Sequence, residues 1–334
     1  MHVKALPTVL SAANTISALP STSLPRAEDA RDVNPFLSKN YFANAYYAGE
    51  LNQTVAAFLA KNDSLNAART RTVQGTGTFV WITSVAGLSN TQSTIDAARA
   101  ERQRTRKQQI VELVLYDLPD RDCSGGQSGG DFSSANDGLN LYKTFVDPYA
   151  AALKAARDLT FAVILEPAAT EFAKVVHLAQ NLTLGGAGAQ IRGFSTDVSN
   201  FNPYIADPRA NYTQYSNAYD ELHYAEVLAP HLANNSLPAH FIIDQGRSGL
   251  QNTRTTWGEW CIVEAGFGIP PTADTNSTLV DSIVWAKPGG ESNGACGPDV
   301  DGGSAPGAGL WWEAYVEELV RNADPPLAAS YTAL

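Results

Sequence analysis

The fold is decided by one stretch, Leu113-Val114-Leu115-Tyr116-Asp117-Leu118-Pro119-Asp120-Arg121-Asp122-Cys123, which is followed by a glycine-rich run from Ser124 to Gly130. Its apolar part is too short for a helix, and it ends at a proline, three aspartates around one arginine, and a flexible loop. This order predicts a buried strand that delivers charged groups to the rim of a sheet, where α/β proteins carry catalytic groups. A solvated acidic turn is the structural alternative.

Strands and helices alternate along the rest of the chain. We expect further strands at residues 78–83, 161–166, 190–195, 240–244 and 280–286, and helices at residues 43–59, 93–109, 139–158, 169–182, 217–232 and 309–322. Near-continuous apolar strands between helices predict a parallel sheet covered by helices, and this many repeats favours a TIM-like β/α barrel. An open doubly wound sheet is the second choice, although no glycine fingerprint of the dinucleotide-binding type follows a strand.

Composition sets limits on domains and partners. Residues 1–33 are rich in Ser, Thr, Ala and Pro, which predicts a disordered leader and linker before a single domain at 34–334. A net charge of -11 argues against nucleic acid, and no run approaches the roughly 18 apolar residues of a membrane span. Six tryptophans offer stacking surfaces to a neutral flat ligand such as a sugar, although most would serve the core in any protein.

Glycosylation acceptors, the leader and the cysteine and histidine spacing bear on localisation and on metal binding. Six Asn-x-Ser/Thr acceptors and a poor or truncated apolar leader at residues 4–19 favour a secreted protein, which we expect to be monomeric. Three cysteines, Cys123, Cys261 and Cys296, are too few for a disulfide scaffold and lack the spacing of a zinc site. The five histidines are scattered, so we expect no metal and no cofactor.

Each predicted strand ends in polar side chains, and in a barrel these ends converge on one face. The polar residues in question are Asp117, Asp120, Asp122, Glu166, Asp244, Arg247, Lys287 and Glu291. Paired carboxylates beside a cation are what cleavage of a glycosidic bond needs, one held protonated and the other ionised. Structural ion pairs of Arg121 or Arg247 with aspartates are the alternative.

The run from Tyr116 to Cys123 closely resembles the first signature of glycoside hydrolase family 6, the inverting cellobiohydrolases and endoglucanases of fungi and bacteria. The resemblance continues to the end of the chain through Asn34-Pro-Phe, Ala43-Asn-Ala-Tyr-Tyr, Phe79-Val-Trp, Ile164-Leu-Glu-Pro, Asp244-Gln-Gly-Arg-Ser-Gly, Trp257-Gly-Glu-Trp-Cys and Lys287-Pro-Gly-Gly-Glu. It implies a distorted β/α barrel whose loops enclose a chain of cellulose or soluble β-glucan, which the enzyme hydrolyses with inversion.

The resemblance also implies roles for individual residues. Asp122 matches the carboxylate that supports the catalytic acid and raises its pKa through like charge, and Tyr116 matches a tyrosine at the cleavage point. Trp81 and Trp260 match sugar-stacking platforms. The polar residues that match the lining of the same cleft are Arg247, Lys287 and Glu291.

The second family signature is broken. It reads Glu-Pro-Asp followed by Ser or Ala, with the Asp as proton donor, whereas this chain has Glu166-Pro167-Ala168-Ala169. The residues after Pro167 resemble a helix that comes later in the family, so one or two βα units, at roughly 30 residues each, are missing. The missing block would hold the disulfide partner of Cys123, and the resemblance still pairs Cys261 with Cys296.

Two further departures affect the chemistry. Asn293 stands where the family usually has an aspartate, and Thr83 where an acidic residue is common. Because each catalytic carboxylate supplies on the order of 10² to 10⁴ in rate, we expect impaired activity unless Asp120, Asp122 or Glu166 substitutes. Three explanations stay open: a misassembled gene or alternative transcript, a non-catalytic glucan binder, and an enzyme with a relocated acid. Exo and endo action are not distinguished.

Overall fold

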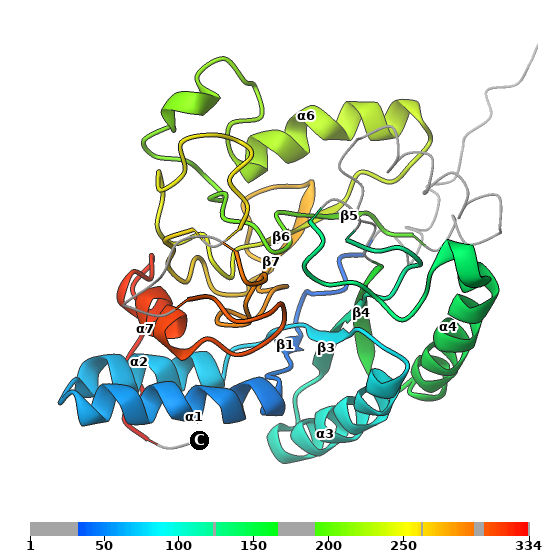
Figure 1. Cartoon of the computed structure of the whole chain (residues 1–334), viewed down its shortest axis with the longest axis horizontal. Coiled ribbons are helices and arrows are strands. Elements are labelled where there is room, and N and C mark those ends of the chain that lie inside the picture. The colour runs from blue at the N-terminus through cyan, green and yellow to red at the C-terminus, as the bar shows by residue number, and fades with distance from the viewer. Residues whose placement is uncertain (1–32, 123–124, 166–190, 262, 297–303, 333–334) are drawn as a thin grey trace, which may run out of the picture. The chain divides into compact units, whose positions relative to one another are not determined.

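The computed structural model describes residues 33–122, 125–165, 191–261, 263–296 and 304–332. The chain divides into two units between Val33 and Asn34, and all the elements below belong to the unit Asn34–Leu334 (Figure 1).

The first sheet is parallel and is built around the strand predicted from the opening stretch. It contains β1 (Asn40–Tyr41), β2 (Val80–Ile82), β3 (Gln109–Leu115) and β4 (Thr160–Leu165). β4 pairs along β3, and the opposite edge of β3 is shared by β1 at its start and β2 at its end. All seven residues of β3 are buried, as the apolar run predicts for a central strand.

The second sheet is also parallel, in the order β5 (Phe194–Thr196), β6 (Phe241–Asp244) and β7 (Val280–Val284). Side-chain and backbone bonds connect its β7 side to the first sheet: the Phe79 amide donates to the Trp285 carbonyl at 3.2 Å, and the Tyr41 and Ser282 hydroxyls lie 2.7 Å apart. A common core contains Ile110, Val114, Ile164, Val284 and Ala286.

The expected closed barrel is not found among the described strands, which form two parallel sheets. No described pairing joins β4 to β5, and β4 is accordingly only partly buried, with Val163 38% and Leu165 49% exposed. The interruption falls where the sequence lacks a block after Pro167. The fold is therefore α/β with parallel strands, and the predicted helix at 169–182 lies outside the described residues.

Helices cover both sheets. They are α1 (Ala45–Ala60), α2 (Ser64–Gln74), α3 (Ser89–Thr105), α4 (Gly138–Ala155), α6 (Glu221–Asn234) and α7 (Glu313–Arg321). α1, α2 and α7 share one apolar cluster, α3 and α4 pack on β3 in a second, and α6 packs on β6 and β7 in a third. Side chains cap three of the helices at their first turns, Asn44 on α1, Asp63 on α2 and Asp220 on α6.

Several elements differ from the prediction. The helix expected to reach residue 109 ends at Thr105, because Arg106 takes a left-handed conformation (φ 58°) and Gln109 already begins β3. α2 is absent from the prediction, since its buried side chains Ala67, Ala68, Thr70 and Val73 are mostly small. β5 begins at Phe194 instead of residue 190.

Candidate active site

The ends of β2, β3 and β7 bring three predicted residues together. The ring of Tyr116 packs edge-on against that of Trp81, with centroids 5.4 Å apart. The Trp81 indole N–H donates to the Ala286 carbonyl at 2.7 Å, which fixes the ring against the segment after β7. The Lys287 ammonium lies 5.0 Å from the centre of the same ring, within cation–π range.

Lys287 and Glu291 form a partly buried ion pair. Lys287 Nζ lies 3.3 Å from Glu291 Oε2, and Lys287 is only 6% exposed. Burial raises the pKa of the Glu291 carboxyl, while the Lys287 charge acts in the opposite direction. The pair therefore places one ammonium over the Trp81 ring and one carboxylate beside that ammonium.

Asp244 is a structural carboxylate, although its position at a strand end suggested chemistry. Its two oxygens accept four backbone N–H groups, from Ser199 at 3.1 Å, Gly246 at 2.9 Å, and Ala286 and Lys287 at 3.0 Å each. Burial raises the pKa of Asp244, and the amide hydrogen bonds oppose this shift. Asp244 thus ties together the segments that follow β5, β6 and β7.

Arg121 also proves structural, as the alternative interpretation of the acidic stretch allowed. It donates to the carbonyls of Thr83 at 2.9 Å and Ser128 at 2.8 Å, and its guanidinium lies 4.3 Å over the Tyr116 ring. Asp117 is fully buried 3.5 Å from Arg121, and burial raises its pKa. The cation of the opening stretch therefore holds the glycine-rich loop in place.

The other two aspartates of the stretch have different partners. Asp120 accepts from the hydroxyl and amide of Ser134, and hydrogen bonds from the Ser134 and Ser133 hydroxyls lower its pKa. Asp122 Oδ2 accepts the amides of Gln127 and Ser128, both at 2.6 Å. Because the Ser128 hydroxyl lies 3.0 Å from the Tyr116 hydroxyl, Ser128 connects the two residues predicted at the cleavage point.

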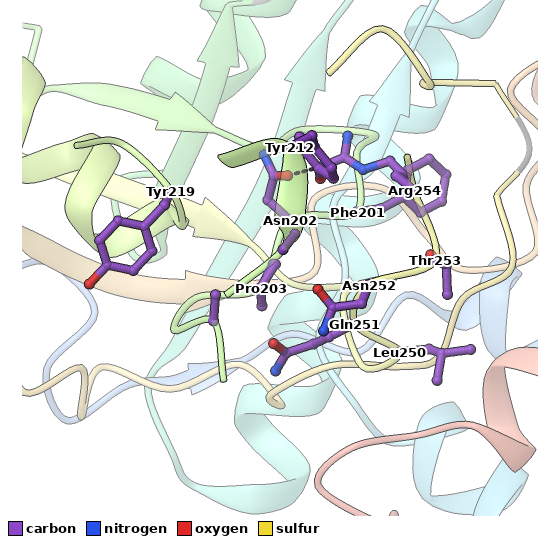
Figure 2. A pocket seen from close by; sticks show the side chains of 12 residues that line it. Phe201, Asn202, Pro203, Tyr212, Tyr219, Leu250, Gln251, Asn252, Thr253 and Arg254 are labelled. Carbon is purple, nitrogen blue, oxygen red and sulfur yellow. Dashed lines mark hydrogen bonds between the residues drawn. The ribbon is translucent and has the colours of Figure 1, made fainter. Parts of the chain in front are cut away.

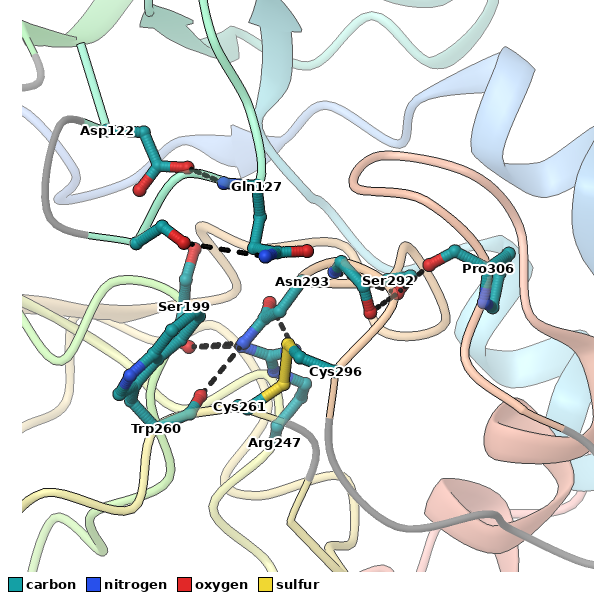
Figure 3. Close-up of a disulfide and its surroundings, with 12 residues drawn as sticks. Asp122, Gln127, Ser199, Arg247, Trp260, Cys261, Ser292, Asn293, Cys296 and Pro306 are labelled. Carbon is teal, nitrogen blue, oxygen red and sulfur yellow. Dashed lines mark hydrogen bonds between the residues drawn. A yellow bond between two sulfur atoms is a disulfide. The ribbon is translucent and has the colours of Figure 1, made fainter.

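Arg247 and Asn293 form a second polar cluster, linked to Trp260. Arg247 is 1% exposed, donates to Asn293 Oδ1 at 2.9 Å and to the Ser199 carbonyl, and stacks on Phe201. The Asn293 amide nitrogen donates in turn to the Trp260 carbonyl at 3.1 Å (Figure 3). Both halves of the amide are therefore used in this network.

The loops of Asp122 and Asn293 abut. Gly294 has φ 143°, a conformation that favours glycine, and a Cβ added there would lie 2.5 Å from Gln127 Oε1 and 2.7 Å from Gln127 Cβ. The disulfide Cys261–Cys296, with Cα atoms 6.0 Å apart, joins the Trp260 loop to the Asn293 loop and confirms the predicted pairing.

The structure thus unites most of the predicted site. The residues placed around one rim are Trp81, Tyr116, Asp122, Arg247, Trp260, Lys287 and Glu291, with Trp260 41% exposed. Glu166, Ala168 and Cys123 lie outside the described residues. Ser128 and Ser199 were missed: Ser199 contributes backbone groups, for which a sequence carries no signal, and Ser128 could be found only from its place in the loop after Asp122.

Neither a cluster of metal ligands nor a membrane-spanning helix is found in the described part of the chain. No three His, Cys, Asp or Glu side chains among those residues are placed to hold a metal ion. None of the described helices is both long and apolar enough to span a membrane.

Comparisons with known proteins agree with the geometry. The model of the glycosyl hydrolases family 6 matches residues 36–176 and 168–323. The 1,4-beta-D-glucan cellobiohydrolase CEL6B of Podospora anserina is 40% identical, over 97% of this chain and 91% of its own. The structure of endoglucanase CEL6B from Humicola insolens superposes with a TM-score of 0.81 at 40% identity, covering 89% of this chain and 100% of that one. The structure of the CcCel6A catalytic domain complexed with p-nitrophenyl beta-D-cellotrioside superposes with a TM-score of 0.80 at 33% identity. The match covers 89% of this chain and 100% of that one.

The lengths of the matches bear on the missing block that the sequence predicts. The alignment with the Podospora protein runs over 386 positions, 52 more than the 334 residues of this chain, so at least 52 of its positions are gaps here. The two matches of the family model meet at residues 168–176, directly after Pro167. The overlap of the two family matches agrees with the predicted deletion at that point, and the alignment length bears on the number of gaps but not on their place.

Proposed function

Because this chain belongs to family 6 of the glycosyl hydrolases, we propose that it binds cellulose or soluble β-1,4-glucan at the strand-end rim. We propose further that it hydrolyses the glucan with inversion of configuration, at an impaired rate. The observation that carries the proposal is a difference between the sugar-binding residues and the catalytic carboxylates. The residues expected to bind sugar are present and fixed in place, whereas Ala168 and Asn293 stand at the positions of two family carboxylates.

Binding is supported by the chemistry of the rim. Trp81 and Trp260 offer rings for the apolar faces of glucose units, and the Lys287–Glu291 pair offers charged hydrogen-bonding groups for hydroxyls. Arg247 is buried and would act by holding Asn293 in place. The structural relative CcCel6A was solved with a cellotrioside, a ligand of the same class. We extend that ligand class to this chain as part of the proposal.

Impairment follows from what inversion requires. One carboxylic acid must protonate the leaving oxygen, and a carboxylate on the other side of the sugar must activate water, with about 6.5 to 9.5 Å between them. Alanine carries no proton to give, and an amide is not a base. Asp122 remains as the supporting carboxylate, and its hydrogen bonds to Gln127 and Ser128 hold it in place.

A non-catalytic glucan binder is the second candidate, favoured by the fit of Asn293. Its carbonyl accepts from buried Arg247 and its amide nitrogen donates to the Trp260 carbonyl, a bond that a carboxylate could not make. The network is therefore satisfied by asparagine, which is expected where the position has adapted to binding.

We propose further that the chain acts outside the cell as a monomer with one domain at 34–334. The Cys261–Cys296 disulfide supports the location, because such bonds persist in oxidising compartments, and the named relatives are fungal cellulases.

Reducing-sugar release and pull-down, both on amorphous cellulose, test the function. We expect binding that the double variant Trp81→Ala, Trp260→Ala weakens at least about tenfold, with release reduced on the order of 10⁴-fold relative to an intact family member. Residual release should be lost in Asp122→Ala, which keeps both tryptophans and so serves as the matched control for binding. Absence of binding by a folded wild-type chain would refute the proposal.

A further inference from the structure

Two adjoining hollows lie beside the strand-end rim, and Phe201, which lines one of them, stacks on the rim residue Arg247. They are formed by the segment after β5, the start of α6 and the loop 250–257, and they share Asn202 and Tyr219 as walls. The narrower one, of about 20 Å³, is drawn in Figure 2, and the wider one has about 240 Å³. None of their lining residues belongs to the predicted active site.

Aromatic rings line both hollows. Tyr212, in the narrower one, packs edge-on against Trp257 of the wider one, with centroids 5.1 Å apart. Trp257 is 50% exposed and Tyr224, which also lines the wider hollow, is 40% exposed. Large rings left half open in a concave wall are suited to stacking against a ligand ring.

The polar part of the walls is held rigidly. Buried Arg254 donates to Asn202 Oδ1, and Asn202 Nδ2 donates to Glu221 Oε1 at 2.7 Å (Figure 2). Asp220 accepts the amides of His223 at 2.9 Å and Ala206 at 3.0 Å. A ligand would therefore meet groups that are already positioned, which reduces the entropic cost of binding.

The charges select among ligand classes. Asp220 and Glu221 line the wider hollow and the chain carries a net charge of -11, so an anionic ligand is disfavoured. Amide side chains of Gln251 and Asn252 beside Arg254 in the narrower hollow disfavour a purely apolar ligand. A neutral ring that carries many hydroxyl groups satisfies both the aromatic and the polar walls.

We propose that these hollows form a second saccharide-binding site, which takes a short neutral oligosaccharide with Trp257 as its stacking platform. The site would anchor the protein on glucan whether or not the strand-end rim hydrolyses it. It therefore does not depend on the function proposed above.

The test is calorimetric titration of the full chain with cellotetraose, and in parallel with the β-1,3-linked laminaritetraose. In the Trp81→Ala, Trp260→Ala background, where the rim site is disabled, we expect binding of at least one probe to remain. Adding Trp257→Ala should weaken that binding at least about fivefold to tenfold, as loss of one stacked ring predicts. Tyr215→Ala, at a fully exposed ring outside the lining, should leave it unchanged.

A second variant, which fills the wider hollow, distinguishes loss of the site from loss of the fold. Ala218→Trp adds a ring in the wider hollow and leaves Trp257 in place, so it should also abolish the residual binding at an unchanged melting temperature. No residual binding of either probe, or residual binding that survives both Trp257→Ala and Ala218→Trp, would overturn the proposal. Residual binding here with no binding at the rim would instead refute only the function proposed for the rim.

Discussion

At the residue scale, local sequence identifies which groups could do chemistry but not which of them are already committed to structure. Asp122 and Asp244 both follow apolar strands, and the strand-end pattern by itself does not distinguish them. Asp244 is occupied by amides of Ser199, Ala286 and Lys287, which lie more than forty residues away in the chain. Only the fold brings those donors to it, so the distinction could not be made from the strand ends themselves.

Glu112 is a second buried carboxyl that the sequence hides in an apolar strand. It lies in the middle of β3 at 1% exposure, neither of its oxygens has a hydrogen-bond partner, and burial, with a smaller effect of Asp244, raises its pKa well above the usual value. At pH values between the ordinary glutamate pKa of about 4.3 and the raised pKa of Glu112, the carboxyl is protonated in the folded state and ionised in the unfolded state. The stability of the protein should therefore fall as pH rises through that window.

The Glu112→Gln variant should remove this pH dependence. We expect it to be more stable than the wild type by more than about 1 kcal/mol at pH 8, and equal to it below about pH 4, where the carboxyl is neutral in both states. Urea unfolding at several pH values measures the difference, with Glu226→Gln on the exposed face of α6 as control. If Glu112→Gln raised the free energy of unfolding equally at every pH, the protonated state assigned to the buried Glu112 carboxyl would be contradicted.

At the element scale, the strands and most helices follow from periodicity, while their pairing partners do not. β3, β4, β6 and β7 are apolar runs bounded by turn residues, and each was predicted within a few residues. The absence of a described pairing between β4 and β5 falls where the sequence predicts the loss of one or two βα units after Pro167. Its structural consequence is that apolar side chains of β4 are exposed on a strand whose pattern is that of a buried one.

The exposed apolar side chains of β4 predict an aggregation-prone surface at this strand. Replacing Val163, which is 38% exposed, by threonine should lower binding of a hydrophobic dye and slow aggregation at little cost in stability, because threonine keeps the β-branched shape. Val111→Thr is the matched control on β3, where Val111 is fully buried and an added hydroxyl should cost about 1 to 3 kcal/mol. Equal dye binding by wild type and Val163→Thr would show that β4 is not the aggregation-prone element.

At the scale of the whole molecule, the strand-end rim is held together by long-range contacts. The Cys261–Cys296 disulfide, the Asp244 amide cluster and the contact of Gln127 with Gly294 bind the loops after separate strands into one rim. These ties account for a rim that persists although at least 52 alignment positions are missing from the chain. The family resemblance anticipated the rim residues, but the tie at Gly294 depends on loop geometry that a single sequence does not carry.

The central claim is that this rim binds glucan and hardly hydrolyses it, and proton NMR of cellotetraose mixed with the protein tests both parts in one tube. The predicted result is broadening of the cellotetraose signals, reversed in the Trp81→Ala, Trp260→Ala variant, with no new anomeric signals from shorter products over many hours. Accumulation of the α-anomer of a shorter product at a rate typical of intact family members, and its loss in Asp122→Ala, would contradict the claim.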